Sequence, residues 1–221
     1  MVLCYHAVSD SWRHRLAMPA SLLLRQVRLL RRFAHVHVTF DYAFRNVRSA
    51  LPPLRDLGVP VTIFVCSGFA DRGGAPLLVP ELETQASDDL EGLRTMSWDE
   101  LRELAAAGVG IGSHTVGHPH LPRLGDAELA DELEESKRRV EDELQQPCPL
   151  LAYPYGEHDE RVRQAARAAG YERAYALKAR SGDAYAAPRL DLYRRHTPLR
   201  TALLASSFLL SSGRADLPKD P

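Results

Sequence analysis

Two histidines lie four residues apart in the stretch GSHTVGHPHL, at His114 and His118. One turn of chain at this spacing can bring two imidazoles to a single metal ion, and imidazole nitrogen is a preferred ligand of Zn²⁺. Gly112, Gly117 and Pro119 argue against a long regular helix, so we expect a loop that holds the pair. An isolated HxxxH is often no more than two surface histidines, so its meaning depends on the other polar residues.

Three further polar motifs also follow strand-like runs. His6 follows VLCY, Asp41 follows VHVTF, and a Pro-Tyr-Gly turn at 154–156 follows LLAY. In parallel α/β folds the carboxyl ends of the strands open on one crevice, where ligands bind. We therefore expect these motifs to meet His114 and His118 at one edge. Two histidines and a carboxylate would form a site for Zn²⁺ or another divalent metal.

A repeated pattern of helix, glycine and strand would position these motifs. Three helix-like segments end at Gly58, Gly108 and Gly170, and a β-rich run follows each glycine. Glycine readily adopts the left-handed conformation just past a helix end. Strands that alternate with helices predict a parallel sheet, either open or closed into a barrel. The length of 221 residues favours a barrel of fewer than eight units.

Polar residues mark the expected starts of the helices. Asn46 precedes VRSALPPLRDL, a capping box spans Ser97–Glu100, and Asp159 precedes ERVRQAARAA. Because proline disrupts a helix interior, Pro52 and Pro53 predict that the first of these helices is irregular or begins later.

Two longer segments differ sharply in pattern. A charged helix is expected from about Asp126 to Gln145, with an apolar stripe that repeats at helical spacing. The stripe consists of Leu129, Leu133, Val140 and Leu144. Residues 70–95 are polar and have no clear period, so we predict a long loop there, and loops of that length in compact domains are often functional.

The charge balance argues against a nucleic-acid partner. The formal net charge is −1, which offers no basic field. A group of arginines follows a helical pattern that predicts a solvated helix face. This group consists of Arg25, Arg28, Arg31 and Arg32.

The cysteines suggest neither a disulfide framework nor a zinc site, and the chain ends suggest a soluble, cytoplasmic protein. Cys4, Cys66 and Cys148 are far apart and form no CxxC pair, so we expect buried, inert thiols. The N-terminal residues lack the pattern of a signal peptide, and the segment 199–210 is too short and too polar to span a bilayer. We therefore expect a cytoplasmic protein with one domain at residues 1–210 and a disordered tail at residues 211–221.

The four polar motifs together resemble the polysaccharide deacetylase family, also called the NodB homology domain or carbohydrate esterase family 4. The motifs are YH at 5–6, TFD at 39–41, SHTVGHPHL at 113–121 and AYPYG at 152–156, and the resemblance covers about residues 2 to 195. It implies an α/β fold, a distorted (β/α) barrel of about seven parallel strands. It also implies a metal-dependent hydrolase that removes N- or O-acetyl groups from an acetylated glycan or amino sugar. The expected metal is Zn²⁺, with Co²⁺ or Ni²⁺ as alternatives.

The resemblance also implies a role for each motif residue. His114 and His118 would be metal ligands, and Asp41 would be the catalytic base that deprotonates the attacking water. His6 would be the general acid that protonates the leaving amine, and the backbone amide of Tyr155 would help to hold the oxyanion. In such a site the metal lowers the pKa of water toward about 7 and polarises the acetyl carbonyl.

Tyr42 departs from the family pattern TFDD, whose second Asp is the third metal ligand. A phenol has a pKa near about 10 and a longer reach, so Tyr42 could ligate only if the metal displaced its proton and the backbone shifted. Asp41 could instead move onto the metal, at the expense of its role as base. His37 is too far along the strand to join the site, and His120 is held by the stiff Pro119 link.

Two main functions therefore remain open. The first is a metal-dependent deacetylase, which the retention of Asp41, His114 and His118 favours. The second is a catalytically impaired pseudoenzyme that binds a glycan or a partner protein without hydrolysis, which Tyr42 favours. Hydrolysis of another C–N bond in a small amide is a third alternative, because a fold alone does not fix the substrate.

Overall fold

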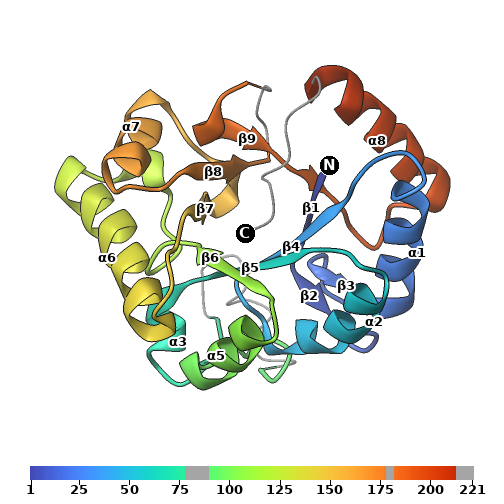
Figure 1. Cartoon of the computed structure of the whole chain (residues 1–221), viewed down its shortest axis with the longest axis horizontal. Coiled ribbons are helices and arrows are strands. Elements are labelled where there is room, and N and C mark those ends of the chain that lie inside the picture. Colours follow the sequence, from blue (N-terminus) through green and yellow to red (C-terminus); the bar gives the residue numbers. More distant parts are fainter. Residues whose placement is uncertain (78–89, 178–181, 213–221) are drawn as a thin grey trace.

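The computed structural model describes residues 1–77, 90–177 and 182–212. Eight strands form one sheet in the order β10-β1-β4-β5-β6-β7-β8-β9, and all neighbouring strands pair in parallel. Strands β9 (Ala187–Pro188) and β10 (Leu190–Asp191), at the two ends of this order, are consecutive in the chain and are joined through Arg189. The sheet therefore curls into a nearly closed barrel (Figure 1).

The other strands of the barrel are short, and their residues are largely buried. Their bounds are β1 Val2–Tyr5, β4 His37–Asp41, β5 Val61–Val65, β6 Gly110–Ser113, β7 Leu150–Ala152 and β8 Arg173–Ala176. Strands β2 (Ala7–Val8) and β3 (Ala17–Met18) form a separate parallel pair. Residues 187–191, which include β9 and β10, form one continuous stretch that closes the barrel. Counted as one strand beside β1 and β4 to β8, this stretch makes seven, so the predicted distorted barrel of about seven parallel strands is confirmed.

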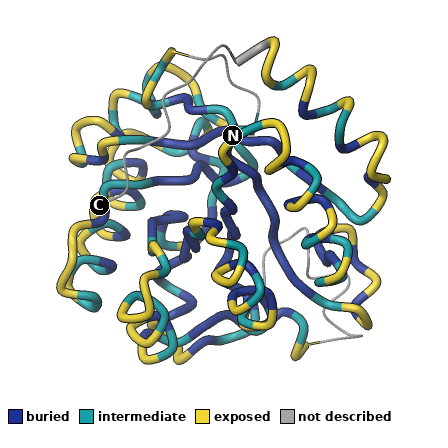
Figure 2. Tube along the Cα trace, turned by 45° about the vertical axis from the view of Figure 1, so that its right-hand side comes forward, coloured by how far each residue is buried: buried dark blue, intermediate teal, exposed yellow. Residues whose placement is uncertain are grey.

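Helices surround the barrel and turn their apolar sides toward the sheet (Figures 1 and 2). The α-helices are α1 Ala20–Leu30, α2 Leu51–Asp56, α3 Ser67–Ala70, α5 Trp98–Ala106, α6 Asp126–Leu144, α7 Glu160–Ala168 and α8 Pro198–Ser212. Short 3₁₀ helices span Arg45–Ala50, Leu121–Arg123, Pro154–Gly156 and Ala184–Ala186. None of the helices in the described part of the chain is long and apolar enough to cross a membrane.

Two of the three predicted helix caps are present. Ser97 Oγ accepts a hydrogen bond from Glu100 N, and the Glu100 carboxylate accepts one from Ser97 N, which forms the expected capping box. Asp159 Oδ1 accepts from Val162 N at the start of α7. The predicted glycines are also confirmed, since Gly58, Gly108 and Gly170 all have positive φ.

The prediction that Asn46 caps a helix is wrong. Asn46 lies inside the 3₁₀ helix Arg45–Ala50, and α2 begins only at Leu51, as the two prolines indicated. The Asn46 side chain instead accepts a hydrogen bond from Val8 N and donates one to Gly92 O. The Asn46 side chain, which the local pattern assigned to a helix cap, is therefore used in tertiary contacts.

The two longer segments meet the predictions in part. Helix α6 ends at Leu144, and Leu129, Leu133 and Val140 are buried as expected. In the expected loop, residues 71–77 and 90–95 are irregular, whereas 78–89 lie outside the described residues. The expected tail also lies largely outside them, at 213–221, but residues 211 and 212 belong to α8.

The interior of the barrel is partly polar. Alternate residues of each strand point inward. One layer is apolar and consists of Val2, Phe64, Ala152, Tyr175 and Ala187. A buried ion pair between Asp41 and Arg189 adjoins this layer, since the Arg189 guanidinium lies 5.3 Å from the centre of the Phe64 ring. The barrel is thus filled by side chains, and its charges lie where the predicted site residues gather.

Candidate active site

The predicted site residues lie at the carboxyl ends of parallel strands of the barrel. His6 follows β1, Asp41 ends β4, and His114 follows β6. Asp41 Oδ2 lies 3.9 Å from His114 Nε2, and the ring centroids of His114 and His118 are 4.8 Å apart. The His6 ring reaches the same place, because its centroid is 5.6 Å from that of Tyr42. The sheet therefore brings these residues together at one mouth of the barrel.

Asp41 is held by a buried arginine that the sequence analysis missed. Arg189 Nη1 donates to Asp41 Oδ1 at 2.6 Å, and Nη2 donates to Oδ2 at 2.8 Å. Arg189 Nη1 also donates to Thr39 Oγ1 at 3.1 Å. The Arg189 side chain is 0% exposed and that of Asp41 is 5% exposed. Such a two-bond, charge-assisted pair fixes the carboxylate in position.

Arg189 also fixes the charge of Asp41. Burial alone would raise the pKa of the Asp41 carboxyl, since burial disfavours the charged form. The positive charge of Arg189 outweighs this effect and holds the pKa well below its usual range, with help from His114. Asp41 is consequently an anion at any pH near neutrality.

His114 is oriented by a backbone carbonyl. Its Nδ1 lies 2.7 Å from Ala152 O, and because a carbonyl can only accept, Nδ1 carries the proton. The lone pair is therefore on Nε2, the nitrogen that faces Asp41. Burial lowers the pKa of His114, which keeps the imidazole neutral. A backbone acceptor on the far nitrogen is typical of metal-binding histidines.

His118 is buried without a hydrogen-bond partner on either ring nitrogen among the described residues. Its ring lies between those of Tyr42, at 4.7 Å, and Tyr155, at 4.5 Å. Burial and the neighbouring His114 lower the pKa of His118 well below its usual value, so this imidazole is also neutral. Because a buried polar group without a partner is costly to stability, His118 is a candidate for binding a ligand at this mouth.

Left-handed backbone conformations are concentrated at this mouth. Non-glycine residues rarely adopt positive φ, and those that do are often at functional sites. One such residue in the described part of the chain, Gln145, ends a helix. All the others adjoin the site: Tyr42, Ala43, Thr115, His118 and Tyr155.

The loop that carries the two histidines is tied to the protein on both sides. His118 N donates to Thr115 Oγ1 at 3.1 Å, within the loop. Glu132 of α6 accepts from Val116 N at 2.8 Å and from Gly117 N at 3.0 Å. The predicted loop conformation is thus confirmed, and its hydrogen bonds hold the strained backbone in place.

Tyr42 occupies the space between the histidines. Its ring centroid lies 5.2 Å from that of His114 and 5.3 Å from that of Phe44, in addition to the contacts with His6 and His118. Tyr42 is 8% exposed, and burial raises the pKa of its phenol well above the usual value. A neutral, aromatic side chain therefore stands where a carboxylate would complete a cation site.

A second group of metal-ligating residues does not suit a cation. Potential ligand atoms of Cys4, His6 and Asp41 lie within 4.8 Å of one another. However, both Asp41 oxygens already bind Arg189, and the Cys4 thiol donates to Asp41 Oδ2 at 3.5 Å. Burial raises the pKa of Cys4 well above its usual value, so the thiol keeps its proton. A dication here would also be repelled by the Arg189 guanidinium.

The two other histidines weighed as substitutes make different contacts. His37 begins β4, at the other end of the strand from Asp41, and its Nε2 lies 2.9 Å from Thr62 Oγ1. His120 stacks on the Tyr155 ring at 4.0 Å, and its Nδ1 lies 2.8 Å from Glu157 Oε2. His120 thus belongs to the rim of the mouth.

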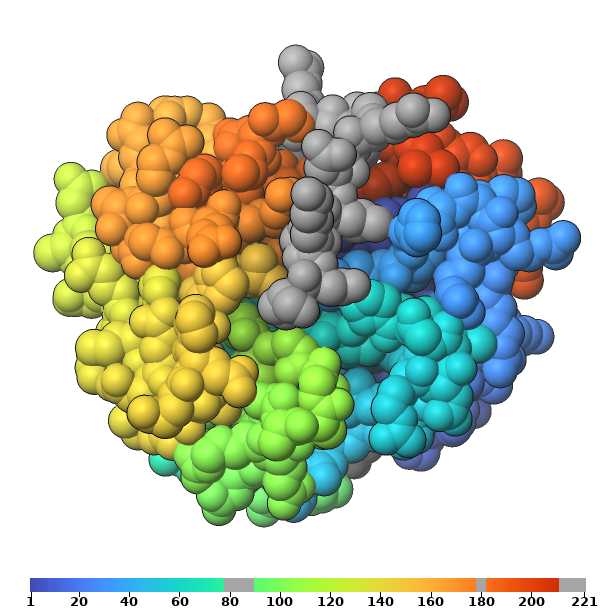
Figure 3. Space-filling view, viewed as in Figure 1, coloured from blue at the N-terminus to red at the C-terminus, as the bar shows by residue number. Residues whose placement is uncertain are grey.

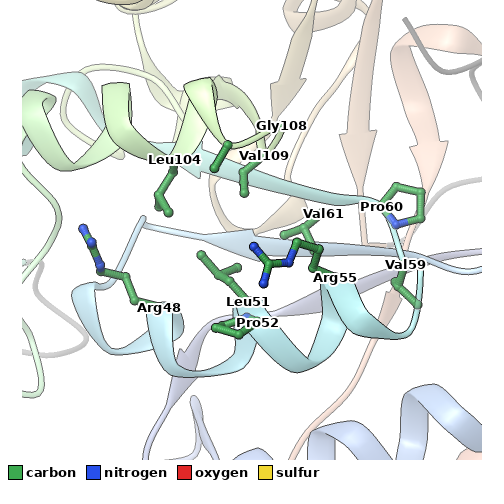
Figure 4. Close-up of a pocket in the computed structure, with 12 residues that line it drawn as sticks. Arg48, Leu51, Pro52, Arg55, Val59, Pro60, Val61, Leu104, Gly108 and Val109 are labelled. Carbon is green, nitrogen blue, oxygen red and sulfur yellow. The ribbon is translucent and has the colours of Figure 1, made fainter.

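A hollow at the opposite end of the barrel has a different character. It encloses about 400 Å³ between α2 and α5, at the amino ends of β5 and β6 (Figure 4). Its walls are mainly aliphatic, and among the described residues that line it only Arg48 and Arg55 are charged. No carboxylate, histidine or cysteine lines it, so it contains none of the predicted site residues.

Similarity to known proteins identifies the family of this chain. A profile described as polysaccharide deacetylase matches residues 31–174, which is more than half of the chain. The chain belongs to the polysaccharide deacetylase family. The Bacillus subtilis protein YxkH, which is named as a polysaccharide deacetylase, is 25% identical over 138 residues. These residues are 62% of this chain but 42% of YxkH, so the chain spans less than half of that relative.

Solved structures support the same fold for this family member. The Streptococcus pyogenes deacetylase PplD, in complex with acetate, has a TM-score of 0.75 at 17% identity and covers 92% of this chain and 96% of its own. IcaB from Ammonifex degensii has a TM-score of 0.71 at 23% identity and covers 93% and 94%. At these identities the likeness establishes the deacetylase fold and leaves the activity to be argued from the site.

Proposed function

We propose that this protein is a metal-dependent deacetylase that hydrolyses N- or O-acetyl groups of an acetylated glycan or amino sugar. The observation that carries the proposal is His118, which is buried with no hydrogen-bond partner among the described residues and lies beside the neutral His114 and the anionic Asp41. A divalent cation would satisfy the buried nitrogen lone pairs and would be attracted by the carboxylate. Membership in the family supplies the substrate class.

The two imidazoles suit a divalent cation of the zinc type. No hydrogen bond from a described residue uses the lone pair on Nε2 of His114, and His118 offers either ring nitrogen. Zn²⁺ is favoured by this donor set, and Co²⁺ or Ni²⁺ would also accept it. A third protein ligand would be Asp41, at the expense of its pair with Arg189, or Tyr42. When bound, the cation supplies Lewis-acid chemistry, which activates water and polarises a carbonyl.

The protein's own groups would then move the protons. Asp41 is ionised over the whole neutral range and would accept the proton of the attacking water, while Arg189 keeps the carboxylate in place. His6 is 6% exposed, its Nδ1 has no partner among the described residues, and it would protonate the leaving group. The backbone amide of Tyr155 would stabilise the oxyanion of the tetrahedral intermediate.

Tyr42 favours a second candidate function, a pseudoenzyme that binds a glycan or a partner protein without hydrolysis. Its ring contacts both candidate ligands, and its phenol resists ionisation. Replacement of an anionic ligand by a neutral one weakens the attraction for a dication. In this case the same mouth would keep its shape while the site binds metal too weakly for catalysis.

The two functions are separated by measuring metal content and acetate release together. The purified protein is supplied with Zn²⁺, Co²⁺ or Ni²⁺, and acetate is measured after addition of acetylated amino-sugar oligomers. We expect about one ion per chain and metal-dependent acetate release. The double variant His114→Ala/His118→Ala should lose both, whereas the control His35→Ala, at an exposed histidine, should lose neither. Absence of stoichiometric metal under all conditions would rule out the enzyme, and oligomer binding without acetate release would favour the pseudoenzyme.

A further inference from the structure

Helix α8 exposes several large apolar side chains. Leu199 is 73% exposed, Leu203 is 63% exposed, and Leu210 is 87% exposed, with Leu209 beside them at 40%. The other exposed large apolar residues in the described part of the chain are Phe33, just after α1, and Leu90. Most of the exposed apolar side chains therefore belong to one helix, and isolated surface leucines would not gather in this way.

These leucines lie on the outer side of α8. Positions 199, 203 and 210 are separated by four and seven residues, a spacing that places them on one side of a helix. The opposite side is buried, at Thr201 and Ala205. Gln26 of α1 donates to the carbonyl of His196 and to Thr201 Oγ1, which fixes the start of α8 against α1. The apolar side chains cannot turn inward, because the inner side of the helix is already packed.

Exposed arginines lie on and next to α8 and its neighbour α1. The two segments that form this part of the surface, residues 11–40 and 192–212, contain no Asp or Glu. Helix α1 lies beside α8 (Figures 1 and 3). The exposed arginines of the two segments include Arg25, Arg28, Arg31, Arg32, Arg195 and Arg200. Within the described residues, none of these six forms an ion pair with a carboxylate. We call these arginines and the exposed leucines the α1–α8 face.

The basic character of the α1–α8 face is local. The whole chain has a net charge of −1, and α6, which lies on another side of the barrel, contains far more acidic than basic residues. The arginines of α6 also pair with neighbouring carboxylates, as Arg138 does with Glu135 and Asp142. The unpaired positive charge on α1 and α8 is therefore specific to the α1–α8 face and does not reflect the amino-acid composition of the whole chain.

We propose that the α1–α8 face docks this protein on a membrane surface that contains anionic lipids. Exposed leucines beside unpaired arginines match a lipid interface, where apolar side chains enter the acyl boundary and guanidinium groups bind headgroup phosphates. Helix α8 lies at the outside of the molecule and has exposed residues along its length (Figure 2), and a deformable lipid surface accommodates a helix in this position. The association is peripheral, because no described helix is long and apolar enough to cross a bilayer.

The proposal is separate from the proposed function and can be tested without activity. Leu203, Leu210, Arg28 and Arg32 are exposed, and they lie on α8 and on or just after α1, which carry none of the mouth residues described above. Substitutions at these positions should leave the fold and the metal site unchanged. Failure of metal binding or of acetate release would not alter the expected lipid binding. Failure of lipid binding would likewise not alter the expected metal binding or acetate release.

The experiment is flotation of the full chain with lipid vesicles. One set consists of phosphatidylcholine alone, and in the other set part of it is replaced by phosphatidylglycerol. We expect binding to the second set, with weakening at high salt. The double variant Arg28→Gln/Arg32→Gln should bind roughly 25-fold more weakly, since each arginine near an anionic surface contributes about fivefold. The double variant Leu203→Gln/Leu210→Gln should lose about tenfold or more.

Matched controls carry the same chemical changes on other faces. Arg102→Gln/Arg138→Gln makes the same charge change on α5 and α6, and Leu90→Gln removes an exposed leucine elsewhere. Both controls should bind vesicles like the wild type, and circular dichroism should show every variant to be folded. The proposal is overturned by absence of binding to phosphatidylglycerol vesicles, or by equal losses in controls and face variants. It is also overturned if light scattering shows a wild-type dimer that the leucine variant dissociates, since a second copy would then cover the face.

Discussion

Two sides of the same mouth differ in how their polar groups are satisfied. On the carboxylate side, both oxygens of Asp41 bind Arg189, and the whole pair is buried. On the imidazole side, His118 has no hydrogen bond to either ring nitrogen from the described residues, and a neutral Tyr42 packs against it. The first side is satisfied within the chain, whereas the second leaves imidazole nitrogens without partners among the described residues. The fold therefore supplies the anion by itself, and the pair of imidazoles is the candidate ligand site.

This difference also separates stability from function. A buried ion pair is expensive to break, because removal of one partner leaves an unpaired charge in the interior. An imidazole without a partner has no hydrogen bond to lose, so its replacement by an apolar ring removes a buried polar group. Substitutions on the two sides should consequently affect different measurements.

The largest effect is expected from Arg189→Met, which leaves Asp41 buried without its counterion. The free energy of unfolding should fall by about 3–5 kcal/mol, as measured by urea denaturation. The double variant Arg189→Met/Asp41→Asn should recover part of this loss, because it removes the stranded charge. As a control, Arg102→Met breaks an exposed ion pair and should cost less than about 1 kcal/mol. A loss at Arg189 no larger than the control would show that the carboxylate side is not a stabilising pair.

The second prediction concerns the pH dependence of the metal-free protein. The pKa of His118 is lower in the fold than in the unfolded chain, so below about pH 6.5 the unfolded chain binds more protons. Stability should therefore fall as the pH falls through this window, by at most about 1.4 kcal/mol per pH unit for one histidine. Asp41 does not contribute here, because its stabilising effect is lost only as the pH falls through a folded pKa far below this range.

His118→Phe isolates the imidazole contribution to this pH dependence. The variant keeps a ring in place and removes the titrating group, so urea unfolding at about pH 7 and about pH 5 should show a smaller difference than in the wild type. At neutral pH its stability should lie within about 1 kcal/mol of the wild type. The exposed variant His35→Phe should leave the pH dependence unchanged. Identical pH dependence in wild type and His118→Phe would contradict a buried, neutral His118.

The smallest expected effect comes from Tyr42→Asp, which adds a carboxylate to the imidazole side. Asp tolerates the left-handed backbone at this position, where φ is 71°, better than most residues do. Metal affinity should rise about tenfold, and acetate release should rise with it, because an anionic ligand is added opposite a dication. Calorimetric titration with Zn²⁺ provides the measurement. Tyr42→Asn fits the same backbone without the charge and should gain little.

An active wild type would give the Tyr42→Asp result a different meaning. If the wild type already releases acetate and Tyr42→Asp leaves affinity and rate unchanged or lower, then Tyr42 is a working part of an adapted site. The imidazole side would in that case be complete without a second carboxylate.

The sequence predicted the position of the site better than its internal chemistry. His6, Asp41 and His114 each follow a strand-like run, and parallel strands place such residues at one edge. This prediction needs only the local pattern of apolar and polar residues and the parallel direction of the strands. It also identified the departure at Tyr42, because the neighbouring motif residues were intact.

Arg189 was beyond the reach of this reasoning. It lies 148 residues from Asp41 in the chain, and the strands on either side of it have two residues each, too few to show a period. One signal was present: Arg189 is a lone charge among apolar residues in AAPRL, as Asp41 is in VTFDY. Asn46 shows a different limit of local patterns. Its residue type suits a helix cap, but its side chain instead forms hydrogen bonds with Val8 and Gly92, which no local pattern predicts.

The closure of the barrel has a consequence for synthesis of the chain. Strand β1 is made first, but its second neighbour is β10, so it remains an open edge until residue 190 has left the ribosome. Asp41 likewise has no counterion until Arg189 emerges. Contacts so distant in sequence form late. A nascent chain that stops before residue 187 thus contains every candidate ligand and yet lacks the anchored carboxylate, so completion of the fold and completion of the site are one late event.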